Sequence, residues 1–276
     1  MSRLLIVSAD DFGLTDGVCR AVLRGFRDGI VRSTSLLAVG RSFDFAVQLL
    51  RDHPDLDLGA HLAMVGEDPP LLTAREIPTL VDKQGAFPLS YRSVIRRGMA
   101  GRLDPDDIRR EFRAQLERIT AAGLPVSHLD THQHTHLWPA VAGVLIELAA
   151  QNDIRAVRTP RSLRVLPIGF GVNALSTRLR KRLQHNNLLT TDSYTGLDEA
   201  GGFDTARFER SLHKLGPTAA TVEVNFHPGE AGDPDTGRFD WGYRWPDELA
   251  TLVSPLTRSL IGKHDFRLGT FKDLRP

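Results

Sequence analysis

Cysteine is almost absent from this sequence. Cys19 is the single one, so no disulfide can form within the chain. This usage fits a reducing compartment. The neighbouring Val18, Val22 and Leu23 have helical apolar spacing, which predicts that the Cys19 thiol lies in the core and is not a nucleophile.

Long hydrophobic runs are absent as well. The first apolar run, residues 4–7, is too short for the core of a signal peptide. No stretch reaches the ~20 apolar residues that a membrane span needs. We therefore expect a cytoplasmic protein without a transmembrane segment.

The chain also lacks a strong charge of either sign. Its formal net charge is +1, which gives no electrostatic reason to expect nucleic acid as a partner. The one basic run, RLRKR at 178–182, is typical of a solvated helix face or loop. Glycine-rich phosphate-binding motifs are missing, so nucleotide binding has no support, and the absence of Cys-x-x-Cys argues against a closed structural zinc site.

Patterns typical of strands and helices alternate along the chain. Strands are predicted at 4–9, 31–39, 56–64, 127–133, 154–158, 221–226 and 267–271. Helices are predicted at 15–29, 43–51, 104–122, 139–151, 205–215 and 246–261, while 65–100 and 160–202 stay unassigned. This alternation implies a parallel α/β sheet, and the number of units favours a (β/α) barrel in one domain over residues 1–276.

Histidine is concentrated in one segment, SHLDTHQHTH at 127–136. Residues two apart on a strand point to the same face, so His128, Asp130 and His132 would project together. His134 and His136 are expected on a loop, because Trp138 and a proline follow them. Imidazole is a common metal ligand and suits proton transfer near neutral pH. The alternative is a hydrogen-bonded cluster that holds a loop, or an adventitious metal patch.

Polar residues fall at the ends of several predicted strands. These residues are Asp10, Asp11, His61, Asp130, His132, Arg158 and His227. Because the site of a parallel α/β fold lies at the carboxyl ends of its strands, we expect these side chains to converge.

Within this group, Asp11, His61 and His132 would make a set of ligands that leaves open positions on a catalytic metal. Adjacent carboxylates on extended backbone point to opposite sides, so Asp10 and Asp11 suit two different tasks. One could bind a metal while the other handles protons. The alternative for the pair is helix capping or a turn.

Four segments resemble the YdjC-like carbohydrate deacetylases, a family that includes the chitooligosaccharide deacetylases. They are LLIVSADDFGLTDG at 4–17, GAHLAM at 59–64, HLDTHQHTHLWP at 128–139 and NFHPGE at 225–230. RTPR at 158–161 and the downstream HPGE resemble the hopanoid-biosynthesis branch more than the chitobiose branch. The resemblance implies a (β/α) barrel related to polysaccharide deacetylases, distorted or incomplete relative to a TIM barrel.

The resemblance also implies hydrolysis of an N-acetyl group from an amino sugar or a glycolipid. It implies a divalent metal on Asp11, His61 and His132, described for the family as magnesium. The same donors would suit zinc, cobalt or manganese, because imidazole favours softer ions. Asp10 would then be the general base, and His227 the acid that protonates the leaving amine.

Other residues near the ligands are expected to orient them. His128, Asp130 and His134 fit this role, and Arg158 could pair with Asp10 and hold it ionised. Substrate specificity is expected in the unassigned segments 65–100 and 160–202. Aromatic candidates for sugar stacking or ordinary packing are Phe87, Tyr91, Tyr194, Phe239, Trp241 and Trp245.

Two other functions stay open from the sequence. Asp130-x-His132-x-His134 is similar to the His-x-His strand ends of amidohydrolases and phosphoesterases, although those folds carry the motif on their first strand. A metal- or sugar-binding module without activity is the second alternative. The sequence is compatible with a homodimer but does not decide the oligomeric state.

Overall fold

A single parallel sheet forms the centre of the computed structural model, which describes residues 2–215 and 218–275. Its strands are β1 (Arg3–Phe12), β2 (Ser33–Leu36), β3 (Asp57–Leu62), β4 (His128–Thr131), β5 (Ala156–Val157), β6 (Ser193–Thr195), β7 (Thr221–Phe226) and β8 (Phe266–Gly269). The strand order is β5-β4-β3-β2-β1-β7-β6, and β8 pairs with β1.

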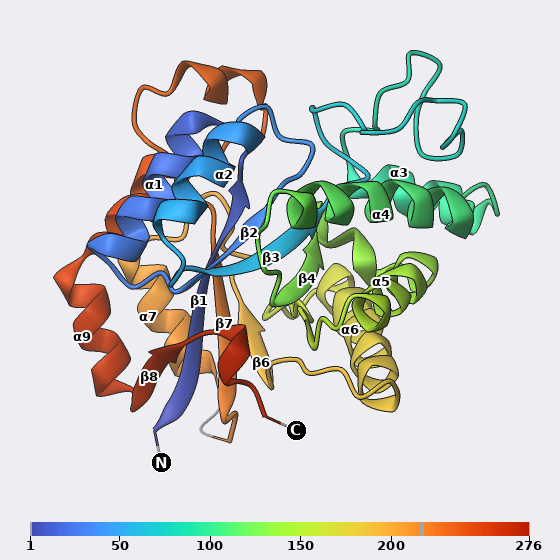
Figure 1. Cartoon of the computed structure of the whole chain (residues 1–276). Helices are drawn as coiled ribbons and strands as arrows, with labels where there is room; N and C mark the ends of the chain where they lie inside the picture. The colour runs from blue at the N-terminus through green and yellow to red at the C-terminus, as the bar shows by residue number, and fades with distance from the viewer. Residues whose placement is uncertain (1, 216–217, 276) are drawn as a thin grey trace.

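Helices surround the sheet, with α1 and α2 on one flank and α4, α5 and α6 on the other (Figure 1). They are α1 (Asp16–Arg27), α2 (Phe43–Asp52), α3 (Tyr91–Met99), α4 (Pro105–Ala121), α5 (Pro139–Gln151), α6 (Pro167–His185), α7 (Thr205–Lys214), α8 (Trp245–Val253) and α9 (Pro255–Lys263). Short 3₁₀ segments are η1 (His132–Leu137), η2 (Pro234–Arg238) and η3 (Phe271–Asp273).

The sheet curls into a distorted barrel, as the sequence predicted. β8 and β2 share one side of β1: β8 pairs with residues 3–6, and β2 pairs with Ser8, Ala9 and Phe12. Between the end strands β5 and β6, Leu189 makes an isolated parallel bridge to Ala156. The barrel is therefore irregular at both places, instead of a ring of eight equivalent strands.

β1 runs past its predicted end at residue 9 and includes both aspartates. Its residues from Leu4 to Phe12 are all buried, as expected for a strand covered on both faces. The register with β2 shifts between Ala9 and Phe12, and Asp11 has a φ of 63°. Adjacent side chains on a strand already point to opposite sides, and this irregularity changes the direction in which Asp11 leaves the strand.

Several predicted elements were wrong in their bounds or missing. Residues 65–100 contain α3, and 160–202 contain α6 and β6. The single helix predicted at 246–261 is two helices, because Pro255 lacks an N–H and begins α9. The last strand ends at Gly269, and η3 follows it.

Two expectations about single features are confirmed. The Cys19 side chain is buried in α1, and burial raises its thiol pKa to about 12, so it is no nucleophile near neutral pH. The basic run at 178–182 lies on α6, where Arg178 and Lys181 are exposed.

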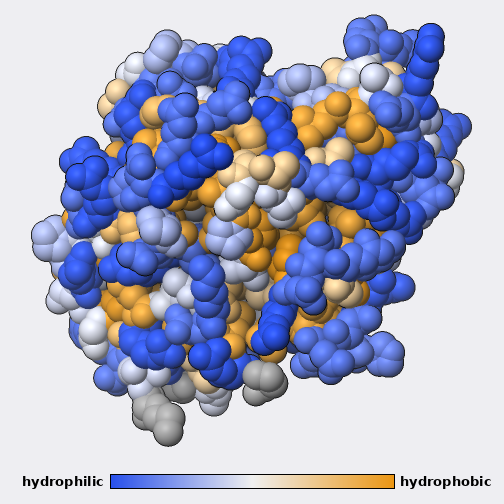
Figure 2. Space-filling view, viewed as in Figure 1, coloured by the Kyte–Doolittle hydropathy of each residue, from blue (hydrophilic) through white to orange (hydrophobic). Residues whose placement is uncertain are grey.

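The surface has hydrophilic residues over most of the helices in the view of Figure 2, with hydrophobic residues toward the middle of this face. No helix of the described residues is long and apolar enough to cross a membrane.

Buried polar side chains of α4 hold the chain that follows β3. The Gln115 amide accepts from Ala63 N at 2.8 Å and donates to Ala63 O at 2.7 Å. Glu111 accepts from the backbone N–H groups of Leu71 and Leu72 at 3.0 and 3.1 Å. These bonds satisfy backbone groups that burial would otherwise leave unpaired. They also fix the direction in which the chain leaves His61.

We expect Gln115→Ala to lower the free energy of unfolding by about 2–4 kcal/mol, because it leaves two buried backbone groups of Ala63 unpaired. Urea denaturation followed by circular dichroism measures the loss. The matched control is Glu117→Ala, which is exposed on the same helix and should change stability by less than about 0.5 kcal/mol. Equal losses in the two variants would contradict this role of Gln115.

Candidate metal centre and active site

Of the nine site residues that the sequence predicts, six line one cavity of ≈ 280 Å³ at the carboxyl ends of the strands. They are Asp10, Asp11, His61, His132, His134 and His227. They come from β1, β3, the start of η1 and the residue after β7. The other three, His128, Asp130 and Arg158, do not line this cavity.

Asp11, His61 and His132 form a compact set of potential metal ligands. Oδ1 of Asp11 lies 2.9 Å from His132 Nδ1 and 3.4 Å from His61 Nε2. One ligand atom from each residue lies within 4.8 Å of the others, and all three side chains are buried. Burial by itself would raise the pKa of Asp11, but the two histidines outweigh it and hold this pKa well below its usual value.

The tautomer of His61 indicates that a cation belongs in this set. Its Nδ1 lies 2.7 Å from Asp130 Oδ1. A carboxylate only accepts hydrogen bonds, so Nδ1 carries the proton. Neutral His61 then presents the lone pair of Nε2 to an oxygen of Asp11. Two acceptors that face each other need a cation between them, either a proton or a metal.

The protonation of His61 follows the same logic. Burial lowers its pKa, but the charges of Asp130 and Asp10 outweigh burial and raise it to about 10. A metal bound by Nε2 would therefore displace a proton, which is the usual coupling between metal binding and ligand pKa. A carboxylate on the other ring nitrogen is the common arrangement behind a metal-bound histidine. The residues present thus fit a divalent metal.

A second group of potential ligands, Asp10, His61 and Asp130, also lies within 4.8 Å. The guanidinium of Arg158 already neutralises it. Nη1 lies 2.6 Å from Asp10 Oδ2 and 2.5 Å from Asp130 Oδ2. Because a fixed cation already occupies this group and pairs with both carboxylates, the set around Asp11 is the better metal site.

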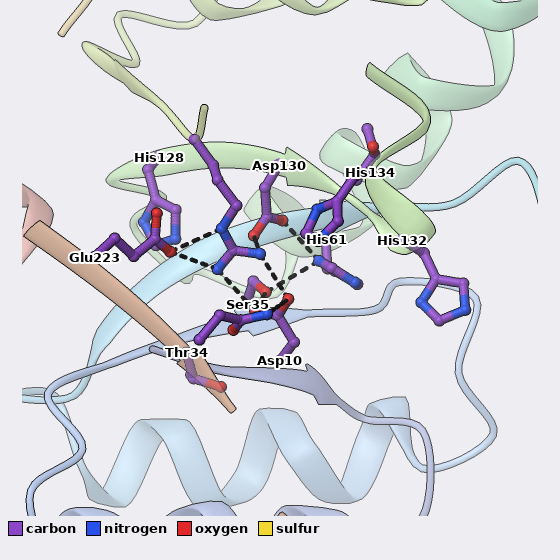
Figure 3. A network of polar contacts seen from close by, with 12 residues as sticks. Asp10, Thr34, Ser35, His61, His128, Asp130, His132, His134 and Glu223 are labelled. Carbon is purple, nitrogen blue, oxygen red and sulfur yellow. Dashed lines mark hydrogen bonds and ion pairs between the residues drawn. The ribbon is translucent and has the colours of Figure 1, made fainter. Parts of the chain in front are cut away.

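Arg158 is buried and forms ion pairs with Asp10, Asp130 and Glu223. Its Nη2 donates to Asp10 Oδ1 at 2.8 Å, and its Nε donates to Glu223 Oε1 at 2.7 Å. Figure 3 shows Asp10, Asp130 and Glu223 turned toward one centre, with His132 turned away from it. The guanidinium thus binds carboxylates from three different strands.

Asp10 has hydrogen-bond donors on both oxygens. Besides Arg158, Ser35 Oγ donates to Oδ1 at 3.0 Å and Asn225 Nδ2 donates to Oδ2 at 2.8 Å. Burial by itself would raise the pKa of Asp10, but Arg158 and His61 outweigh it and lower the pKa. Asp10 is therefore ionised and held in one orientation.

Sequence reasoning missed Ser35, Glu223 and Asn225. The signal for the last two was present: polar residues two apart on an otherwise apolar strand, followed by His227 at the same spacing. Glu223 is fully buried, and its burial raises its pKa to about 7 despite the opposing effect of Arg158. No comparable pattern marks Ser35, which reaches Asp10 only through the pairing of β1 with β2.

His128 lies apart from the metal set, although the strand pattern predicted a shared face with His132. β4 ends at Thr131, so only His128 and Asp130 share the strand. The His128 ring stacks on Phe271 at a centroid distance of 3.7 Å. Its Nδ1 forms a hydrogen bond with Ser127 Oγ at 2.8 Å. It makes no contact with a candidate ligand, so the structure gives it no place in orienting them.

The histidines after β4 lie in η1, not in a loop. Gln133 and His134 both have positive φ values, 52° and 53°, which turn His134 into the cavity. His136 points the other way: its Nδ1 is 2.7 Å from Thr131 Oγ1, and its Nε2 is 3.1 Å from the carbonyl oxygen of Arg158. His136 therefore anchors the turn that presents His132 and His134.

His227 reaches the cavity from the end of β7. Its backbone N–H donates to Glu248 Oε2 at 2.6 Å, and this fixes the position of the residue. Among the described residues, its Nδ1 has no hydrogen-bond partner, although the atom is buried. The ring is therefore placed beside the cavity with an unused nitrogen.

Aromatic side chains of the segment after β7 cover one side of the cavity. The Trp241 ring lies 5.4 Å from the ring of His132, and Trp241 and Tyr243 both line the cavity. Trp241 Nε1 donates to Glu67 Oε1 at 2.9 Å, which joins this segment to the one after β3. Of the other aromatic candidates, Tyr91 lines the cavity, and the remaining four, Phe87, Tyr194, Phe239 and Trp245, are buried.

Comparison with known proteins adds to this geometry. The model of the YdjC-like protein family matches residues 4–263. A protein of Geobacillus stearothermophilus named carbohydrate deacetylase is 30% identical over 99% of this chain and 98% of its own length. One of the same name from Brevibacillus brevis is 29% identical over 98% of this chain and 99% of its own length.

A solved structure from Enterococcus faecalis, a candidate cellobiose-phosphate cleavage protein, has the same fold. Its TM-score is 0.84 at 21% sequence identity, and the alignment covers 100% of both chains. The four motifs, the family match over nearly the whole chain and these relatives agree. The chain belongs to the YdjC-like protein family, together with proteins named carbohydrate deacetylase.

Proposed function

We propose that this protein is a metal-dependent hydrolase that removes the N-acetyl group from an N-acetylated amino sugar or its glycoconjugate. One observation carries the proposal: an Asp/His/His set suited to a metal lies in the same cavity as an ionised aspartate. The names of the relatives support a carbohydrate substrate and a deacetylation.

Asp11, His61 and His132 are the proposed ligands. A divalent metal held there would polarise the acetamide carbonyl and lower the pKa of a bound water. Two imidazoles and one carboxylate suit zinc, cobalt or manganese, whereas the family resemblance points to magnesium.

Asp10 is the proposed general base. Arg158, Ser35 and Asn225 keep its carboxylate charged in a buried position and fix its orientation beside the cavity. The same donors lower its basicity, so Asp10 suits the abstraction of a proton from an already acidic donor and not from bulk water. Its low pKa keeps it ready to accept a proton over the whole neutral range.

His227 is the proposed acid that protonates the leaving amine. It lines the cavity, and its Nδ1, which lies 4.0 Å from Glu248 Oε2, makes no hydrogen bond to another described residue. Expulsion of an amine needs a proton on nitrogen, because the amide anion is a very poor leaving group. Placing base and acid on β1 and β7 puts them on separate strands around the cavity.

The cavity favours an acetamide over a phosphate ester, the substrate of the alternative hydrolase. None of the described residues that line it is a lysine or arginine. Arg158 lies beneath it, but Asp10, Asp130 and Glu223 take up its charge. Phosphate sites commonly use free cationic donors, and this cavity supplies none from its lining.

A second, apolar cavity of ≈ 470 Å³ adjoins the metal cavity and shares Tyr91, Gln133, His134 and Leu197 with it. Its walls include Val94, Ile95, Trp138 and Leu175. A free sugar would leave these walls in contact with water. We therefore infer that the amino sugar is joined to an apolar aglycone, which is the glycolipid alternative.

The first test is acetate release by metal-stripped protein reloaded with magnesium, zinc, cobalt or manganese. N-acetylated chitobiose and a lipid-linked N-acetylglucosaminide are the two substrates. We expect release only with metal, and faster release from the lipid-linked substrate. Hydrolysis of a phosphate ester without acetate release would favour the alternative hydrolase. Sugar binding without any turnover would favour a non-catalytic module.

Two substitutions separate metal binding from proton transfer. His132→Ala should lose bound metal, because two ligands remain of three. Asp10→Asn should keep the metal and lose about 10²–10⁴-fold in kcat, because an amide accepts no proton. Metal content by mass spectrometry and circular dichroism accompany the kinetics, since Asn at this position pairs less well with Arg158. Wild-type metal content in His132→Ala would refute the ligand assignment.

Leu175→Gln tests the apolar cavity without touching the proposed ligands. We expect kcat/KM for the lipid-linked substrate to fall about tenfold, because a polar group replaces an apolar contact with the aglycone. Hydrolysis of the chitobiose substrate should stay near wild type and serves as the internal control. Equal losses on both substrates would contradict the placement of the aglycone.

A further inference from the structure

Hydrophobic side chains are exposed to solvent where the chain enters α6. Val165 is 84% exposed, Leu166 52%, Ile168 57% and Phe170 63%. These four lie within six residues, whereas the other large hydrophobic residues described as exposed, Leu89, Met99 and Leu256, are scattered along the chain. A concentration of this kind on a protein surface commonly marks an interaction site. We call residues 165–170 the apolar rim.

Basic side chains lie directly beside the apolar rim. Arg164, Val165 and Leu166 line a surface groove of ≈ 710 Å³ together with Arg207, Arg210 and Lys214 of α7. In the part of the chain that the structure describes, Arg210 and Lys214 make no ion pair or hydrogen bond through their side chains. Their charges are available to an external partner.

The two acidic residues of the same groove are engaged within the protein. Asp198 accepts hydrogen bonds from Ser162 Oγ at 2.9 Å and Leu163 N at 2.6 Å. Glu199 accepts from Gly196 N at 3.2 Å and Ser211 Oγ at 3.3 Å. The four basic side chains of the groove still outnumber its two carboxylates. Arg164 pairs with Asp198 at 3.5 Å and Arg207 with Asp204 at 3.9 Å, so Arg210 and Lys214 supply the net positive charge next to the apolar rim.

The apolar rim is continuous with the interior of the protein. Ile168 and Arg164 also line the apolar cavity that adjoins the metal cavity. A partner surface that binds the apolar rim would therefore lie next to the outer edge of the apolar cavity, which adjoins the candidate site. α6 is not long and apolar enough to cross a bilayer, so it would lie on such a surface.

We propose that the apolar rim docks this protein on the surface of a lipid bilayer that contains anionic lipids. Val165, Leu166, Ile168 and Phe170 would enter the interfacial region, and Arg207, Arg210 and Lys214 would face the headgroups. Apolar side chains flanked by basic ones are the pattern of interfacial membrane binding. A protein partner fits less well, because the centres of protein interfaces are depleted in lysine.

The test is co-sedimentation of the full chain with vesicles, measured without substrate so that it does not depend on the proposed hydrolysis. One vesicle is phosphatidylcholine alone, and the other is phosphatidylcholine mixed with phosphatidylglycerol. We expect the wild type to bind the mixed vesicle at low salt and to be released at higher ionic strength, which screens the attraction. Binding to phosphatidylcholine alone should be much weaker.

Three variants assign the binding to the proposed surface. Ile168→Ser with Phe170→Ser should lower partitioning onto mixed vesicles about tenfold or more. Leu256→Ser, which removes an equally exposed hydrophobic residue from α9, should leave it unchanged. Arg210→Gln with Lys214→Gln should remove most of the preference for anionic lipid. We expect each variant to fold, because all these side chains lie at the surface, and thermal unfolding checks this.

Three results would overturn the proposal. The first is no binding of the wild type to mixed vesicles at low salt. The second is equal binding by the wild type and the Ile168→Ser/Phe170→Ser protein. The third is a wild-type dimer in light scattering that becomes a monomer in this variant while neither protein binds vesicles; the apolar rim would then be an interface between copies of this chain.

Discussion

The ion pairs of one buried guanidinium organise the interior of this barrel. Arg158 follows β5 and reaches Asp10 on β1, Asp130 on β4 and Glu223 on β7. Carboxylates removed from water are tolerated only with a counter-charge and satisfied hydrogen bonds, and removal of one partner typically costs about 3–5 kcal/mol. Burial raises the pKa of Glu223 to about 7, and the charges of Asp10 and Asp130 add to this effect while Arg158 opposes it.

The same guanidinium affects the candidate site indirectly, through the two aspartates that it binds. It holds Asp10 ionised beside the cavity. It also pairs with Asp130, whose Oδ1 accepts the hydrogen bond that His61 Nδ1 donates. That hydrogen bond leaves Nε2 of His61 as the nitrogen facing Asp11. The ion-pair network and the proposed metal-ligand set therefore share His61. Support of this kind behind a ligand fixes its orientation and its tautomer.

The irregular end of β1 separates two tasks between adjacent residues. The register shift before Phe12 and the positive φ of Asp11 let Asp10 face the Arg158 network while Asp11 faces the two histidines. The two cavities share Tyr91, Gln133, His134 and Leu197. The first also contains the proposed ligands, and the second is lined mainly by aliphatic and aromatic side chains.

Local sequence patterns are enough to predict the class of fold and the side chains that converge at the candidate site. Apolar runs that end in Asp or His locate β1, β3, β4 and β7, and the carboxyl ends of parallel strands meet at one edge. This is why Asp10, Asp11, His61, His132 and His227 could be expected to converge. Local pattern is sufficient for this, because both the strand and the residue that ends it are encoded within a few positions.

Which of these side chains are in contact depends on the tertiary structure. β6 and α3 are short, and α6 begins with Pro167 and has Gly169 and Gly171 within its first five residues, so periodicity did not reveal them. Ser35 meets Asp10, and His128 meets Phe271 instead of the ligands, through the relative register of strands and the curl of the sheet. Strand register depends on packing between segments that are far apart in the chain, and a local sequence pattern does not specify which distant segment a strand packs against.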